Sequence, residues 1–141
     1  MVAASALRVV IVDDEEMMRT LVRRTLERMG FSQIFTAKDG AEGLELARSQ
    51  RPDVVISDYD MPNMQGLQFL KAVRAEPDLA KTAFVMLSGS TNSMVRQRAR
   101  DFGANSIIMK PFLSADLKNE LGALVHELTG SAIEWTPFKR I

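Results

Sequence analysis

The sequence contains no cysteine and a single histidine, His126. The missing thiols exclude disulfides and thiolate metal sites, and one histidine argues against a histidine-rich metal site or a Ser-His-Asp triad. Neither sign of charge is in excess, because 18 Lys and Arg balance 18 Asp and Glu. A net charge of zero removes the simplest argument for nucleic-acid binding, which needs a basic domain or face. We therefore expect no direct nucleic-acid partner.

Long hydrophobic runs are also missing. No run approaches the roughly eighteen apolar residues that span a membrane. The opening segment, Met1 to Leu7, is too short for a secretion signal and lacks a basic leader. We therefore expect a cytoplasmic protein with no membrane partner, and a length of 141 residues suits one domain.

Five short apolar runs divide the sequence at regular intervals. Most are continuous rather than alternating, which is typical of strands buried on both faces of a parallel sheet. These predicted strands cover residues 9–12, 34–37, 54–57, 84–87 and 106–109.

Helical spacing of apolar residues occurs between these runs, and residues of the kinds that cap helices flank it. Asp39 with Glu42 is a predicted N-cap pair. The periodic stretches are 17–29, 42–47, 67–73, 94–102 and 113–128; the fourth has Thr91, Asn92 or Ser93 as N-cap, and the expected stops are Gly30, Gly103 and Gly130. Strand and helix alternate five times, which predicts an α/β fold: a doubly wound parallel sheet with helices on both faces.

Only residues 131–141 fall outside this alternation, so we predict a domain over residues 1–130 and a C-terminal tail over 131–141. A frayed tail is the simplest expectation, since chain ends are usually poorly ordered. Large apolar side chains are costly to leave in water, however, which favours docking on the domain or on a neighbouring chain. The side chains in question are Ile133, Trp135, Phe138 and Ile141.

Polar side chains follow four of the five predicted strands. Asp13 and Asp14 follow the first, Asp58 the third, Ser88 the fourth and Lys110 the fifth. Ligands of open parallel sheets bind beyond the carboxyl ends of the strands. We therefore expect these five side chains to converge at one edge.

The chemistry of such a cluster is specific. Three carboxylates repel each other and need a positive counter-charge. A Mg²⁺ ion can supply it, because this ion prefers oxygen ligands. A metal-bound carboxylate can attack a phosphoryl group to form an acyl phosphate, while the hydroxyl of Ser88 and the ammonium of Lys110 can stabilise phosphoryl oxygens. Each residue alone has a plainer explanation, since an Asp pair is commonly a helix cap. Their joint position at the strand ends favours a site.

This order of motifs resembles the response-regulator receiver domains of two-component systems. The motifs are Val12-Asp13-Asp14, Asp58, Ser88-Gly89 and Lys110-Pro111-Phe112, together with the stretch from Asp58 to Gly66, which is similar to the loop after the family's phosphoacceptor. The resemblance covers roughly Arg8 to Leu128. It implies a flavodoxin-like fold, with five helices and a five-stranded sheet in the order 2-1-3-4-5.

The resemblance also implies a phosphorylation-dependent switch rather than an enzyme. Asp58 would be the phosphoacceptor, receiving the group from a histidine kinase or phosphotransfer protein in a phosphorelay. Asp14 and Asp58 would bind Mg²⁺ directly with the backbone carbonyl of Asp60, and Asp13 would act through water.

The remaining roles concern the phosphoryl group and the output. Ser88 and Lys110 would contact the phosphoryl group, and the family's Lys-Pro bond is cis, so we expect a cis bond between Lys110 and Pro111. A downstream protein or output domain would bind the face formed by the helix at 94–102, the strand at 106–109 and the helix at 113–128. The resemblance leaves a homodimer open.

Three positions depart from the commonest family pattern. Ser88 stands where Thr is frequent, Ile107 where Tyr or Phe is frequent, and Asp60 where the side chain is often neutral. Ile107 is stiff at χ1 and cannot swing as an aromatic ring does. We therefore expect the switch to act through the loop from Gly89 to Ser93 and the helix that follows.

Three other interpretations compete with this one. Asp58-Tyr59-Asp60 matches the Asp-x-Asp of haloacid dehalogenase-type phosphohydrolases, but their motif follows the first strand and they are larger. A receiver that scaffolds without phosphorylation usually lacks one of the acidic or lysine positions, and none is missing here. The third interpretation, an input domain excised from a longer regulator, stays open.

Overall fold

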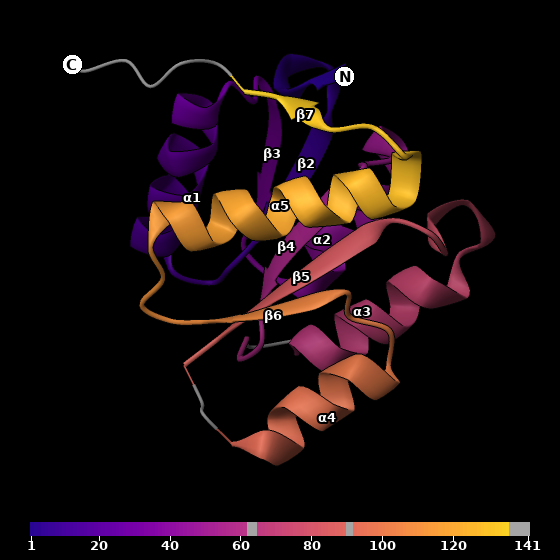
Figure 1. Ribbon diagram of the computed structural model, residues 1–141. Coiled ribbons are helices and arrows are strands. Elements are labelled where there is room, and N and C mark those ends of the chain that lie inside the picture. Colours follow the sequence, from indigo (N-terminus) through magenta and orange to yellow (C-terminus); the bar gives the residue numbers. More distant parts are fainter. Residues whose placement is uncertain (62–64, 90–91, 136–141) are drawn as a thin grey trace.

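Five parallel strands form the central sheet of the computed structural model, which describes residues 1–61, 65–89 and 92–135 (Figure 1). Their order across the sheet is β3-β2-β4-β5-β6. These strands are β2 (Arg8–Val12), β3 (Gln33–Ala37), β4 (Val54–Asp58), β5 (Ala83–Ser88) and β6 (Ser106–Met109). Numbered among themselves they follow the order 2-1-3-4-5, so the predicted doubly wound fold is confirmed.

Five helices cover the two faces of this sheet. Successive strand residues point to opposite faces. Thus Val9 and Ile11 join a core with α1 and α5, whereas Val10 and Val12 join a core with α2 and α3. Burial on both faces is the reason that the strands are continuously apolar. The helices are α1 (Glu16–Met29), α2 (Gly40–Gln50), α3 (Gly66–Ala75), α4 (Ser93–Asp101) and α5 (Ser114–Thr129), with short 3-10 turns η1 (Ala4–Ala6) and η2 (Pro77–Leu79).

The predicted helix ends are confirmed where the structure describes them. The Asp39 carboxylate accepts a hydrogen bond from the backbone N–H of Glu42 at 2.9 Å. Asn92 caps α4 by accepting from the backbone N–H of Met94 at 2.8 Å, while Thr91 lies outside the described residues. Gly30 ends α1 in the left-handed conformation, with φ of 108°. Within the described ranges, no helix is both long and apolar enough to span a membrane.

The two chain ends pair with each other, a feature that the alternation of strands and helices does not predict. β1 (Val2–Ala3) and β7 (Ile133–Glu134) form a parallel two-stranded sheet beside α5 (Figure 1). The backbone N–H of Val2 donates to the carbonyl of Ala132 at 2.8 Å. The first residues of the chain and the start of the tail therefore form one structural unit.

The tail also contributes to the core. Ile133 is buried, and Trp135 meets Phe31 edge-on, with ring centroids 6.0 Å apart. The ammonium of Lys118 on α5 lies 5.3 Å from the centroid of the Trp135 ring, a cation–π contact. The expected docking of the tail on the domain is thus confirmed for Ile133 and Trp135. Phe138 and Ile141 lie outside the described residues.

Candidate functional site

The register of the sheet brings the predicted site residues to one edge. Val12 of β2 is level with Ser57 of β4, so the next residues, Asp13 and Asp58, lie side by side. On the other side of β4, Ser88 is the last residue of β5 and is level with Met109 of β6.

Lys110 enters the site directly after β6. Its backbone N–H donates to the carbonyl of Ser88 at 2.8 Å, which extends the β5–β6 ladder by one bond. The bond between Lys110 and Pro111 is cis, as the resemblance implies. Lys110 and Ser88 therefore stand beside each other at the edge that carries the acidic residues.

Three carboxylates gather at this edge. Oxygen atoms of Asp13, Asp14 and Asp58 all lie within 4.8 Å of one another. Asp13 and Asp58 are buried, with 1% and 6% of their surfaces exposed, whereas Asp14 is exposed. Burial raises the pKa of the Asp13 and Asp58 carboxyls above the ordinary value, and the neighbouring carboxylates raise it further. The cluster therefore favours a bound cation or proton.

Lys110 supplies one positive charge to this cluster. Its ammonium donates to Asp58 Oδ1 at 2.9 Å and lies 3.4 Å from Asp13 Oδ2. Burial opposes the charge, but the hydrogen bond and attraction to Asp58, aided by Asp13, outweigh it and raise the Lys110 pKa. Lys110 thus stays charged at neutral pH. A single ammonium cannot neutralise three carboxylates, which leaves the site net negative.

The donor set fits a magnesium ion. All the gathered side-chain donors are carboxylate oxygens, which Mg²⁺ prefers. Oxygen ligands about 2.1 Å from Mg²⁺ lie at most roughly 4.2 Å apart, so a separation within 4.8 Å requires only a small closure. One face remains open to water through the exposed Asp14.

Asp60 stands apart from this group. It follows Asp58 by two residues, its side chain is exposed, and its carboxylate is not part of the three-Asp cluster. The Asp60 carboxylate therefore lies in solvent and does not join the carboxylates of Asp13, Asp14 and Asp58. A role for its backbone carbonyl as a metal ligand stays a prediction.

Two residues near the site were not assigned a role from the sequence. Arg19 on α1 donates from Nη1 to the backbone carbonyl of Asp13 at 2.7 Å. Gly66 begins α3 against β4, where its N–H donates to the carbonyl of Tyr59 at 3.0 Å. A Cβ at Gly66 would lie 2.4 Å from the carbonyl oxygen of Asp58. The only sequence clue to Gly66 was its position in the loop that resembles the family.

Replacing Gly66 with Ala is expected to destabilise the protein. The added methyl would collide with the backbone of Asp58 and Tyr59, and overpacking of this kind costs about 1–3 kcal/mol. Urea unfolding would measure the loss. Gly122→Ala on α5 is the control, since the nearest atom to its Cβ among the described residues is Trp135 Cζ2 at 3.6 Å, an ordinary contact, and removing a helical glycine gains about 0.5–1 kcal/mol. Equal stability of Gly66→Ala and wild type would refute the close approach.

Comparisons with known proteins agree with this geometry. A family model described as the response regulator receiver domain matches residues 9–122. The chain is 39% identical over 121 residues to a probable chemotaxis protein CheY of Rhizobium etli, covering 86% of this chain and 94% of that protein. It is 33% identical over 122 residues to chemotaxis protein CheY-3 of Vibrio cholerae, with coverage of 86% and 94%.

Solved structures show the same likeness. Chemotaxis protein CheY4 of Vibrio cholerae matches with a TM-score of 0.79 and 36% identity, covering 84% of this chain and 98% of that one. The receiver domain of a signal transduction histidine kinase from Syntrophus aciditrophicus has a TM-score of 0.80 at 24% identity, covering 89% and 94%. This second likeness concerns the fold.

Proposed function

The chain belongs to the response-regulator receiver family, and from this premise we propose that it is a signalling switch operated by phosphorylation of Asp58 in the presence of Mg²⁺. The observation that carries the proposal is the arrangement around Asp58. This buried carboxylate is paired with the ammonium of Lys110 at 2.9 Å and shares its edge of the sheet with two further carboxylates.

The geometry supports a separate role in phosphoryl transfer for each residue of the site. Lys110 holds Asp58 Oδ1, so Oδ2 is the oxygen that forms the bond to phosphorus. The bond between phosphorus and the nitrogen of a histidine donor breaks, and its electron pair stays on the donor imidazole. Lys110 keeps its proton and moves its charge toward the phosphoryl oxygens, beside the Ser88 hydroxyl. Bound Mg²⁺ would be held by Asp14, Asp58 and the Asp60 carbonyl, with Asp13 through water, and would neutralise charge on the transferred group.

The test uses a small phosphodonor. We expect acetyl phosphate with Mg²⁺ to add one phosphoryl group to the protein, as measured by intact mass, and expect chelation of the metal to prevent it. A chain that stays unmodified under both conditions would refute the proposed function and leave a scaffolding receiver as the better interpretation.

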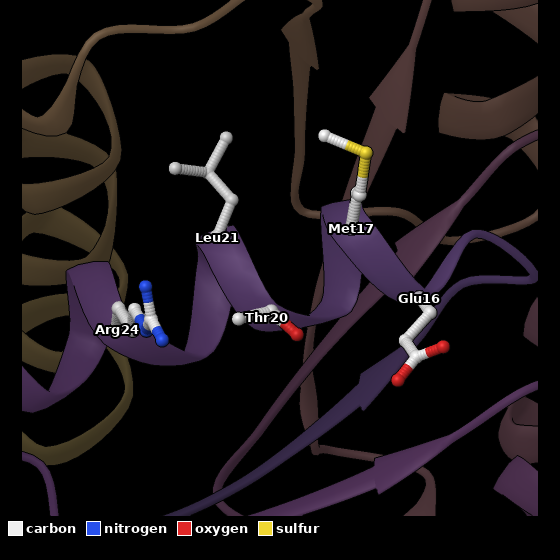
Figure 2. A pocket seen from close by; sticks show the side chains of 5 residues that line it. All are labelled: Glu16, Met17, Thr20, Leu21 and Arg24. Carbon is white, nitrogen blue, oxygen red and sulfur yellow. The ribbon is translucent and has the colours of Figure 1, made fainter.

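The start of α1 offers a surface for the phosphodonor protein (Figure 2). Met17 and Leu21 project from the same side of the helix and are 86% and 53% exposed, so together they form an apolar patch of the kind found at interaction sites. They line a hollow of about 410 Å³ with Glu16, Thr20 and Arg24. Because α1 begins two residues after Asp14, a histidine kinase or phosphotransfer protein docked there would lie next to the acidic edge.

The proposed output face consists of α4, β6 and α5. α4 is loosely held on the sheet, since it buries a single residue, Ala99. It also carries three exposed arginines, namely Arg96, Arg98 and Arg100. Ile107 of β6 is partly buried against the core formed with α2 and α3. A loosely held helix that follows β5 in the chain and contacts β6 is suited to respond to changes at Ser88 and to bind a downstream protein or output domain.

Phosphorylation is expected to change backbone hydrogen exchange across residues 92–102. The reason is that attraction of Ser88 toward the phosphoryl group shifts the segment leading into α4, of which Ser90 and Thr91 lie outside the described residues. Mass spectrometry of exchanged peptides would measure the change, with α2 as the control segment, because α2 packs on the same face of the sheet but against β2 and β3. Protection altered only around Asp58 and Lys110 would contradict this route.

Other parts of the proposal follow from the family rather than the geometry. The chain would act as a switch without enzymatic turnover of its own, and its location would be the cytoplasm, where its phosphodonor is expected. The proposed switch applies equally to a free-standing regulator, a homodimer and the input domain of a longer regulator.

A further inference from the structure

The loop between β2 and α1 is held by hydrogen bonds at several points. The backbone N–H of Asp13 donates to the carbonyl of Ala37 at 3.1 Å. Its carboxylate accepts from the backbone N–H of Glu15 at 2.9 Å and lies 3.4 Å from the Lys110 ammonium. The one remaining polar group of Asp13, its carbonyl, accepts from the partly buried side chain of Arg19 at 2.7 Å.

Arg19 holds this loop in two places. Its side chain binds the carbonyl of Asp13, and its backbone N–H donates to the carbonyl of Glu15 at 3.0 Å. These two carbonyls flank Asp14 in the chain. Because a peptide group is planar, fixing the carbonyl of Asp13 also fixes the N–H of Asp14. The next peptide is held by the Glu15 N–H, which donates to Asp13 Oδ1. The two peptide planes together set the direction in which the Asp14 side chain leaves the backbone.

This restraint matters most for Asp14. Asp13 and Asp58 are buried and held by Lys110, whereas Asp14 is exposed. The position of an exposed side chain depends largely on its backbone. We propose that Arg19 is a positioning residue, which aims the Asp14 carboxylate at the metal through its bond to the carbonyl of Asp13. This inference rests on the proposed function, in which Asp14 is a Mg²⁺ ligand.

The proposal predicts that replacing Arg19 weakens Mg²⁺ binding, whereas a purely electrostatic role would predict tighter binding. A guanidinium near the site repels a divalent cation, so removing its charge should strengthen Mg²⁺ binding if Arg19 acts only as a charge. Loss of positioning weakens binding instead, since partners that orient metal ligands are typically worth roughly ten- to a hundredfold in affinity.

Three variants separate these effects, with Mg²⁺ alone as the titrant and backbone amide shifts as the measurement. Arg19→Met is expected to bind Mg²⁺ roughly tenfold more weakly than wild type. Arg19→Lys keeps a charged donor and should bind with intermediate affinity. Arg23→Met removes the same charge one turn further along α1, from an exposed side chain that pairs with Glu27 at 3.9 Å, and should bind as wild type does or slightly more tightly.

The outcomes are distinguishable. Equal or tighter binding by Arg19→Met would overturn the positioning role, and so would an equal weakening in Arg23→Met. A folding defect is recognised by urea unfolding without metal, and in that case Arg19→Lys decides. Binding by Arg19→Lys that is tighter than binding by Arg19→Met, with an Asp14 amide shift close to that of wild type, supports the proposal. Binding as weak as that of Arg19→Met, in an Arg19→Lys protein that is stable, refutes it. Failure of the wild-type protein to bind Mg²⁺ would instead refute the proposed function.

Discussion

Replacing Asp58 with Asn is expected to abolish phosphorylation by acetyl phosphate. The substitution keeps the size of the side chain but removes the anionic nucleophile, and Lys110 retains a partner in Asp13 at 3.4 Å. The fold should therefore survive. Since burial raises the pKa of Asp58, its charged form is disfavoured in the folded state. The neutral amide should accordingly leave the metal-free protein as stable as wild type or more stable at neutral pH.

Asp60→Asn is the matched control for this experiment. It makes the same chemical change two residues away, at an exposed side chain outside the carboxylate cluster. This variant should still accept one phosphoryl group, as measured by intact mass. Labelling of Asp58→Asn at the wild-type rate would show that Asp58 is not the phosphoacceptor.

Replacing Asp14 with Ala is expected to weaken Mg²⁺ binding by at least about a hundredfold, the upper end of what the loss of an outer-shell partner costs. The substitution removes a carboxylate from the three that gather within 4.8 Å. Because Asp14 is exposed, its removal leaves no cavity in the core, and stability without metal should not fall. Titration followed by amide shifts of the residues around Asp58 would measure the affinity.

Glu16→Ala provides the control for charge, since it removes an exposed carboxylate two residues further along the chain. It should bind Mg²⁺ with nearly wild-type affinity. An unchanged binding curve for Asp14→Ala, or an equal loss in Glu16→Ala, would remove Asp14 from the ligand set.

The same titration should depend on pH. Magnesium binds the deprotonated carboxylates, so protons compete with it. Burial raises the pKa of Asp13 and Asp58 above the ordinary 3.8, and the affinity should therefore begin to fall at a higher pH than for exposed carboxylates. In the metal-free protein, stability depends on pH in the opposite direction to the Mg²⁺ affinity. The folded state then binds protons more tightly than the unfolded chain. The contribution of these two groups to the free energy of unfolding therefore rises as the pH falls through their folded-state pKa values.

The amino-acid sequence alone determined the layered fold and the membership of the acidic edge. Continuous apolar runs such as Val9–Val12 and Val54–Ser57 require burial on both faces, and in a parallel sheet every carboxyl end lies at the same edge. Asp13, Asp58, Ser88 and Lys110 were therefore assigned to one site by their positions after the strands, and the register of the sheet agrees. Local signals such as Asp39 before Glu42 also sufficed, because a helix cap depends only on neighbouring residues.

Only the tertiary structure decided how these groups are held. The bond from Arg19 to the carbonyl of Asp13 and the contact of Gly66 with the backbone of Asp58 depend on side-chain reach and on how closely a helix approaches a strand, which no pattern of residue types records. The pairing of Val2 with Ile133 joins two-residue strands at opposite ends of the chain. Strands this short carry no periodicity that could predict them. They pair because the folding of the rest of the chain brings the two ends together.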